Sequence, residues 1–168
     1  MALQRLTTLI LVILFNLAAL ACSASRLPSS ELLGLRVGMD KASAQAHLNE
    51  ISDFIRSEGR NQELWKLKDA SRFETLAVGY SGDQIRYVTA FVNKAAREKP
   101  LPFSSIGDIR VARSEIAEPH FRYIWDVPVT KNQPACSVNV YGDNPEFVTM
   151  YTLVRRSENE SKSIEEDD

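Results

Sequence analysis

The amino-acid sequence predicts an α+β fold of two tandem units, each a helix plus an antiparallel sheet, with the helices packed on one face of the sheet. Within each unit, apolar residues at helical spacing come first, and strand-like segments joined by turn residues follow. The hairpin-like segment VGYSGDQIRYVTAF at 78–91 also recurs as VNVYGDNPEFVTMY at 138–151. The 168 residues suffice for one ordinary domain or two very small ones.

The first unit, residues 34–93, begins with a helix predicted over residues 40–57. Asp40 is a good N-cap, because its carboxylate can accept the unpaired amide protons of the first turn. An apolar stripe at helical spacing follows, formed by Ala44, Leu48, Ile51 and Ile55. Three strands are predicted after the helix, the last two joined across turn residues, at 63–67, 73–80 and 85–92.

A linker with two prolines, residues 94–105, leads to the second unit, residues 106–156. Residues 106–116 predict a weaker, shorter helical or turn segment, and three strands are again expected, at 121–129, 136–141 and 147–154. A gapless shift of 60 residues places Trp65 on Trp125 and gives six identities in eighteen positions, where chance gives about one. We favour an internal duplication, and two unrelated hairpins with similar Gly-Asp turns are the alternative.

Residues 1–21 predict a signal peptide, because Arg5 precedes an apolar run that ends in small residues. The apolar run is shorter than the roughly 20 residues that a membrane-spanning helix needs, and an uncleaved anchor is the alternative. Residues 19–22, ALAC, resemble a bacterial lipobox, whose cysteine becomes the lipidated first residue of the mature chain. Ala19 stands where lipoboxes prefer leucine, and ordinary cleavage after Ala21 fits the same residues.

The two cysteines of the chain, Cys22 and Cys136, allow three arrangements. We favour lipid attachment at Cys22, with residues 22–33 as a tether to the fold. A disulfide bond and two unrelated thiols are the alternatives. A disulfide would join the leader to the interior of a strand, where a single cysteine is commonly a small buried hydrophobic residue.

The formal net charge of −2 is unevenly distributed. Residues 157–168, SENESKSIEEDD, contain six acidic residues and one lysine, which predicts a disordered acidic tail. An acidic interaction tail is the alternative. Once Arg5 and this tail are set aside, the body carries +2 and has no basic stripe. Nucleic-acid binding is therefore not expected.

The segments GLRVGMDKASAQAHL, LWKL and ETLAVGYSGDQIRYVTAF resemble the SmpA/OmlA family, which includes the small outer-membrane lipoprotein of the β-barrel assembly machinery. The tandem arrangement resembles that of the β-lactamase inhibitor protein. The resemblance covers residues 34–92, and 106–154 by internal repetition, and it implies the fold and the export class but neither partner. The family's Leu-Gly-x-Pro helix exit is absent after Leu48, and the inhibitor's disulfides have no counterpart.

Residues able to carry catalysis are scattered along the chain. Neither His47 nor His120 has partners at metal-ligand spacing. The serines lack the G-x-S-x-G context of an activated nucleophile, and the seven glycines form no phosphate-binding loop. We therefore expect no enzyme activity, no catalytic residue, no metal site and no cofactor.

Six aromatic residues of the predicted strands form a candidate binding face: Trp65, Tyr87, Phe91, Trp125, Phe147 and Tyr151. Exposed aromatic faces bind proteins well, and the alternative is that these residues are core. The expected function is that of an exported, lipid-anchored protein on the periplasmic face of the bacterial cell envelope, which binds or scaffolds an envelope protein. A secreted soluble inhibitor or ligand-binding module is the alternative.

Overall fold

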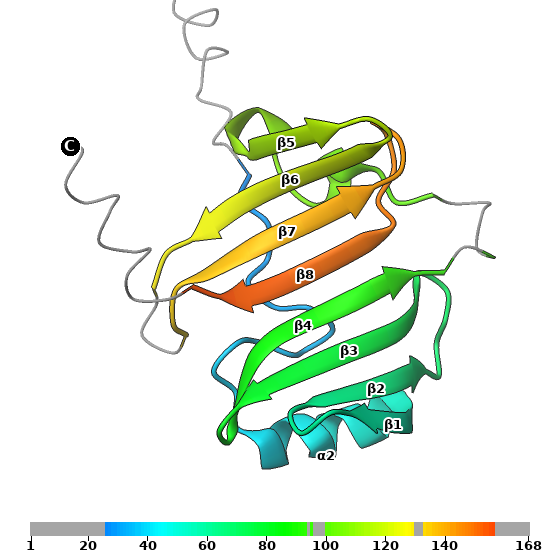
Figure 1. The fold of residues 1–168 in the computed structure, drawn as a ribbon, viewed down its shortest axis with the longest axis vertical. Helices are drawn as coiled ribbons and strands as arrows, with labels where there is room; N and C mark the ends of the chain where they lie inside the picture. Colours follow the sequence, from blue (N-terminus) through cyan, green and yellow to red (C-terminus); the bar gives the residue numbers. More distant parts are fainter. Residues whose placement is uncertain (1–25, 94, 96–99, 130–132, 157–168) are drawn as a thin grey trace, which may run out of the picture.

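A single antiparallel sheet of eight strands forms the body of the protein (Figure 1). The computed structural model describes residues 26–93, 95, 100–129 and 133–156, so the predicted signal peptide, Cys22 and the acidic tail lie outside the described residues. The strand order across the sheet is β1-β2-β3-β4-β8-β7-β6-β5. The strands are β1 (Ser52–Glu58), β2 (Gln62–Leu67), β3 (Phe73–Ser81), β4 (Gln84–Val92), β5 (Arg113–Ala117), β6 (His120–Val127), β7 (Cys136–Gly142) and β8 (Met150–Arg155).

The prediction of two tandem helix-plus-sheet units is wrong. The described residues contain one α-helix, α2 (Lys41–Ile51), and the strands form one continuous sheet. The two halves of the sheet join where β4 pairs with β8, with Val88 opposite Leu153. Both of these residues are fully buried. Joining the halves here removes two sheet edges that would otherwise expose unpaired backbone groups.

The first helix begins as predicted and ends earlier than predicted. Its N-cap is Asp40, whose Oδ1 accepts the amide of Ser43 at 2.8 Å. The helix ends at Ile51, and the hydroxyl of the next residue, Ser52, donates to the carbonyl of Leu48 at 2.6 Å. The chain then continues as strand β1, which contains Phe54 and the β-branched Ile55 and pairs with β2 instead of extending the helix.

The segment 106–116, predicted to be helical or turn, contains the short 3-10 turn η2 (Ile109–Val111) and most of strand β5, and a second such turn, η1 (Phe103–Ser105), precedes it. The carboxylate of Asp108 accepts the amide of Arg110 at 3.0 Å and caps a single turn. Short side chains that bond to nearby backbone in this way compete with helix propagation. The six predicted strands are present, with bounds that differ by up to three residues.

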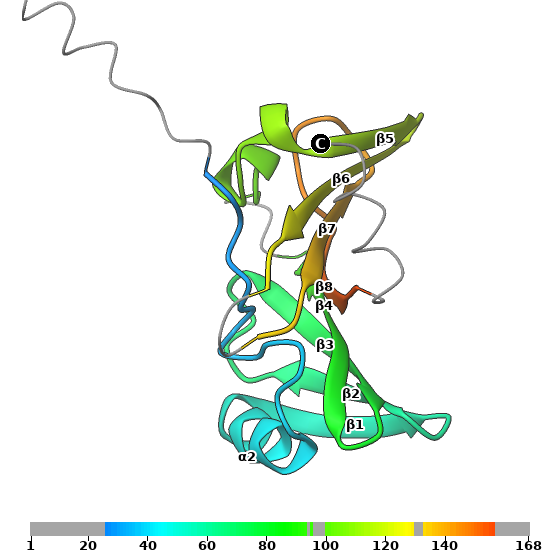
Figure 2. The same ribbon diagram turned by 90° about the vertical axis from the view of Figure 1, so that its left-hand side faces the viewer.

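One face of the sheet, the packed face, is covered by α2, by residues 26–37, and by residues 101–112, which contain η1 and η2 (Figure 2). The buried core lies between this cover and the sheet, with Leu76, Trp125 and Leu153 among its members. Burying one such side chain fully contributes about 1.5–3 kcal/mol.

The segment expected to be a tether is bound to the fold from residue 26 onward. The carbonyl of Arg26 accepts the amide of Asp108 at 2.8 Å, and Pro28 is buried. The carbonyl of Ser29 accepts a hydrogen bond from the Tyr151 hydroxyl at 3.0 Å. Residues 26–33 of the predicted tether are therefore part of the fold, and residues 22–25 lie outside the described residues.

Candidate functional site

The other face of the sheet, the open face, is left uncovered by the described helices and by the two covering segments (Figure 2). Successive side chains of a strand point to opposite faces, and residues directly opposite each other on paired strands share a face. The register of the sheet therefore assigns each strand residue to the packed face or to the open face.

A row of five paired residues, the Phe91 row, crosses the open face. Its members come from strands β4, β8, β7, β6 and β5 in that order: Phe91, Met150, Tyr141, Arg122 and Glu115. The row is apolar at its β4 end, where Phe91 is 40% exposed. It is charged at its β5 end.

Arg122 is held by contacts with neighbouring strands. Nη1 donates to Glu115 Oε2 at 2.7 Å, Nη2 donates to Asn139 Oδ1 at 2.8 Å, and the guanidinium carbon lies 5.3 Å from the centre of the Tyr141 ring. Among the described residues, nothing accepts a hydrogen bond from its buried Nε. Charge-assisted bonds and stacking on an aromatic ring together fix the guanidinium plane. Arg122 is therefore a positioned cation at the charged end of the row.

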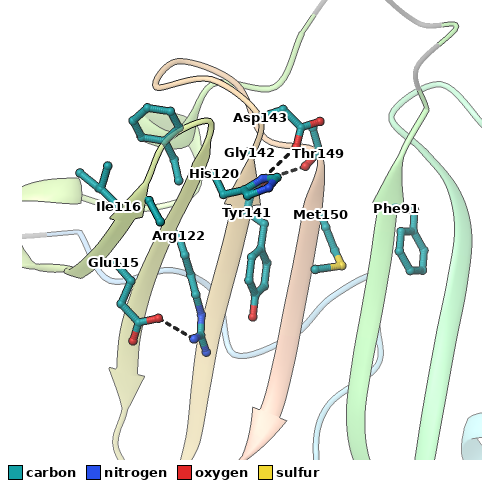
Figure 3. Close-up of a pocket in the computed structure, with 12 residues that line it drawn as sticks. Phe91, Glu115, Ile116, His120, Arg122, Tyr141, Gly142, Asp143, Thr149 and Met150 are labelled. Atoms are coloured by element: carbon teal, nitrogen blue, oxygen red, sulfur yellow. Dashed lines mark hydrogen bonds and ion pairs between the residues drawn. The ribbon is translucent and has the colours of Figure 1, made fainter.

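A hollow of about 710 Å³ lies over this row (Figure 3). Phe91 lies at one side of the hollow and Ile116 at the other, with Met150 and Tyr141 between them (Figure 3). The volume is within the range of pockets that bind small molecules or single side chains of a partner. The mixture of apolar walls and a positioned cation suits an apolar group that has a hydrogen-bonding or anionic neighbour.

An ion pair between His120 and Asp143 lies at the rim of the hollow, with Nδ1 and Oδ1 3.8 Å apart (Figure 3). Both side chains are largely exposed, and solvent-exposed pairs of this kind contribute little to stability. Within the described part of the chain, no three His, Cys, Asp or Glu side chains gather to hold a metal ion.

The middle of the open face is more polar than the Phe91 row. The hydroxyls of Thr89 and Thr152 are hydrogen-bonded at 3.0 Å across β4 and β8, and Ser137 donates to Asp126 at 2.9 Å. These groups are already paired within the sheet. The apolar surface offered to a partner is therefore concentrated at the Phe91 row.

The structure places three of the six predicted binding residues in the core. Trp65, Trp125 and Tyr151 lie on the packed face and are 3%, 1% and 4% exposed. Their indole and phenol groups are hydrogen-bonded inside the protein. These three residues are therefore core residues, as the alternative interpretation expected.

The other three predicted residues do not form one group. Tyr87 and Phe91 lie four residues apart on the open face of β4, where the Tyr87 hydroxyl donates to Gln62. Phe147 is half-buried in the connection before β8, in an isolated bridge with Pro102. Phe91 alone belongs to both the predicted set and the Phe91 row.

The length of the second hairpin explains this separation. The shift of 60 residues matches Val78 to Val138 and Val88 to Val148. Val78 pairs with Val88, but Val138 pairs with Leu153, which lies five residues beyond Val148. Because side chains alternate along a strand, an odd offset reverses the face. For this reason Tyr151, which the shift matches to Phe91, lies on the opposite face.

Four members of the Phe91 row were missed in the sequence: Met150, Tyr141, Arg122 and Glu115. Alternation along each strand indicates which residues share a face within that strand. The order of the strands and their register bring these four together. No local signal in the sequence gives that register.

Comparison with known proteins finds no match: no protein-family model, no curated protein and no solved structure is similar to this chain. The resemblance to the SmpA/OmlA family stays a prediction. In the described part of the chain, no helix has the length and apolar character required to cross a lipid bilayer.

Proposed function

We propose that this chain is an exported, lipid-anchored protein of the bacterial cell envelope that acts by binding another envelope protein and not by catalysis. Its anchor is Cys22, and its contact surface is the open face at the Phe91 row. The observation that carries the binding proposal is the uncovered sheet face with a hollow at its most apolar point. The export signal and the lipobox-like residues carry the location.

The chemistry of the row favours a partner that inserts an apolar side chain. Phe91 and Met150 provide apolar contact area, and aromatic anchors in a pocket commonly dominate binding energy. Arg122 is placed to donate a hydrogen bond to an acidic or carbonyl neighbour of that side chain, because its guanidinium is already oriented. The partner therefore combines an apolar side chain with an adjacent hydrogen-bond acceptor.

Site-specific photo-crosslinking in intact envelopes of the native host tests the contact surface. A photoreactive residue at Phe91 should give a discrete crosslinked species, whereas the same residue at Ile55, exposed on edge strand β1, should not. Adding Met150→Glu should abolish the species formed at Phe91, because a charge would enter the apolar part of the hollow. Identical crosslinks at the two positions would exclude the Phe91 row as the contact surface.

The intact mass of the mature protein tests the anchor. Acyl chains on an N-terminal Cys22 are expected, and Cys22→Ala should release the protein from the membrane fraction. An unmodified start at or after Cys22 would overturn the anchor.

The hollow also favours the second candidate function, a secreted soluble inhibitor or ligand-binding module, because its volume suits a small ligand. A free pool of the protein in the medium, together with an unmodified N-terminus, would place this alternative first.

A further inference from the structure

The surface around Asp108 gathers three exposed apolar side chains. The amide of Asp108 donates to the carbonyl of Arg26, which precedes Leu27, and its carbonyl accepts the amide of Val111 at 3.2 Å. Ile109 follows Asp108 in the chain. We call Leu27, Ile109 and Val111 the Leu27 patch, and their exposed fractions are 49%, 39% and 47%.

Two arginines border this patch. Arg26 donates to the carbonyl of Ser105 at 3.4 Å, and Arg110 makes a two-pronged contact with the Asp108 carboxylate, with bonds of 2.9 and 2.7 Å. Large apolar side chains beside guanidinium groups match the boundary of a lipid bilayer, where acyl chains meet phosphate groups.

The length of chain before Arg26 points to the bilayer as the occupant. Only residues 23–25 separate Cys22 from Arg26, and four residue steps span at most about 14 Å when fully extended. The segment cannot lengthen without breaking contacts, because Pro28 is buried, and the carbonyls of Ser29 and Ser30 accept bonds from Tyr151 and Gln133. A lipid on Cys22 therefore holds this surface within a short reach of the membrane.

We infer that the Leu27 patch docks on the lipid surface that holds the anchor, so that the protein lies against the membrane in one orientation. The inference rests on the proposed lipid attachment at Cys22. In this orientation β5 lies near the membrane and β1, at the other edge of the sheet, lies far from it (Figure 1). The open face with the Phe91 row then points along or away from the membrane, toward neighbouring envelope proteins.

Depth-dependent fluorescence quenching tests the docking. The mature, acylated protein is purified from its host and placed in vesicles of phosphatidylethanolamine and phosphatidylglycerol that contain a nitroxide-labelled lipid. An environment-sensitive fluorophore is attached at Ile109→Cys, or at Leu27→Cys as an independent position. The matched control is Ile55→Cys, 45% exposed at the far edge of the sheet. Cys136 is fully buried and does not compete for the label.

Blue-shifted emission and severalfold stronger quenching at positions 109 and 27 than at position 55 are expected. Inserting a Gly-Ser linker of about ten residues between Ser25 and Arg26 should lower this quenching, because such a linker behaves as a flexible coil. Equal quenching at the three positions would overturn the docking. An equal blue shift at positions 109 and 27 when soluble protein replaces the vesicles would also overturn the docking. That result would indicate a second copy or another protein on the patch.

The mass of the same sample separates the two proposals. An acylated protein without quenching at position 109 leaves the lipid anchor standing and overturns the docking alone. An unmodified N-terminus overturns both.

Discussion

Strands β1–β4 pack against a helix, whereas strands β5–β8 pack against irregular chain (Figure 2). The helix α2 forms its own backbone hydrogen bonds, so it can lie on the sheet through apolar contacts alone. The irregular cover, residues 26–37 and 101–112, carries backbone carbonyls that need partners when they are buried. The two halves of the sheet therefore place different polar groups on the same packed face.

In the second half, large aromatic side chains of the sheet bury their rings and donate hydrogen bonds to backbone carbonyls of the irregular cover. The Trp125 indole Nε1 donates to the carbonyl of Asp108 at 3.0 Å, and the Tyr151 hydroxyl donates to that of Ser29 at 3.0 Å. Such amphipathic rings normally find a partner when buried. Each ring thus contributes both to the core and to fixing the irregular cover.

In the first half, the corresponding groups bond a carboxylate. Trp65 Nε1 and the Tyr80 hydroxyl both donate to Glu63 Oε2, at 3.3 and 3.0 Å. Gln45 and Lys41 of α2 contact Oε1, at 2.7 and 3.5 Å. Burial, followed by the neighbouring carboxylate of Glu63, raises the pKa of the Tyr80 phenol well above its ordinary value. A buried acid therefore joins the helix to the sheet in this half.

Trp125→Ala should give the largest effect, about 3–5 kcal/mol less stability in urea unfolding, because the side chain is 1% exposed. Trp125→Phe keeps much of the apolar volume but removes the bond to Asp108, and should cost about 1 kcal/mol more than the volume change alone. Ile55→Ala, at an exposed position, should stay within about 0.5 kcal/mol of the wild type. A loss below about 1 kcal/mol for Trp125→Ala would contradict the core placement.

The sequence predicts the strands of this sheet only where one face is buried. Strands such as β2 and β6 alternate because residues like Trp65 and Trp125 face the core. All five residues of β5 are exposed, and β1 buries only its first residue, so neither edge strand carries a period-two signal. The helix prediction extended over β1 because Ile55 continues the helical spacing, although it lies exposed at the sheet edge.

The candidate site shows the same limit. Phe91 is recognisable as an aromatic strand residue, and its place on the open face follows from alternation once one face of β4 is known to be buried. The position of Arg122 in the hollow depends on β5, β6 and β7. In the sheet these strands follow β8 in reverse chain order, beyond the junction of β4 and β8. Long-range register of this kind is not encoded in any local pattern.

Removing the carboxylate in the first half should have the next largest effect. Glu63→Ala leaves the Trp65 indole and the Tyr80 hydroxyl without acceptors, and should cost about 2–3 kcal/mol. Glu115→Ala is the matched control, because Glu115 also pairs with a cation but is half-exposed on the open face, and should cost less than about 1 kcal/mol. Urea unfolding of the two variants compares them directly. Equal losses of stability would show that the contacts of Glu63 contribute no more than an exposed ion pair does.

The smallest expected loss of stability concerns side-chain packing on the open face, which differs between the two halves. In the first half, Gly79 lies opposite Tyr87, and an added methyl group at Gly79 would meet the Tyr87 ring. Gly79→Ala should therefore cost about 1–2 kcal/mol by overpacking. In the second half, the shift of 60 residues places Asn139 at this position, and Asn139 bonds Arg122 instead of lying under a ring.

A double-mutant cycle isolates that contact. In the Tyr87→Ala background, Gly79→Ala should cost little, because the ring that it would meet is gone, so the two changes should be non-additive by at least about 0.5 kcal/mol. Additive losses in urea unfolding would show that the ring moves aside freely. The Tyr87 side chain would then be able to move for a partner, and the binding surface would extend along β4 from Phe91 to Tyr87.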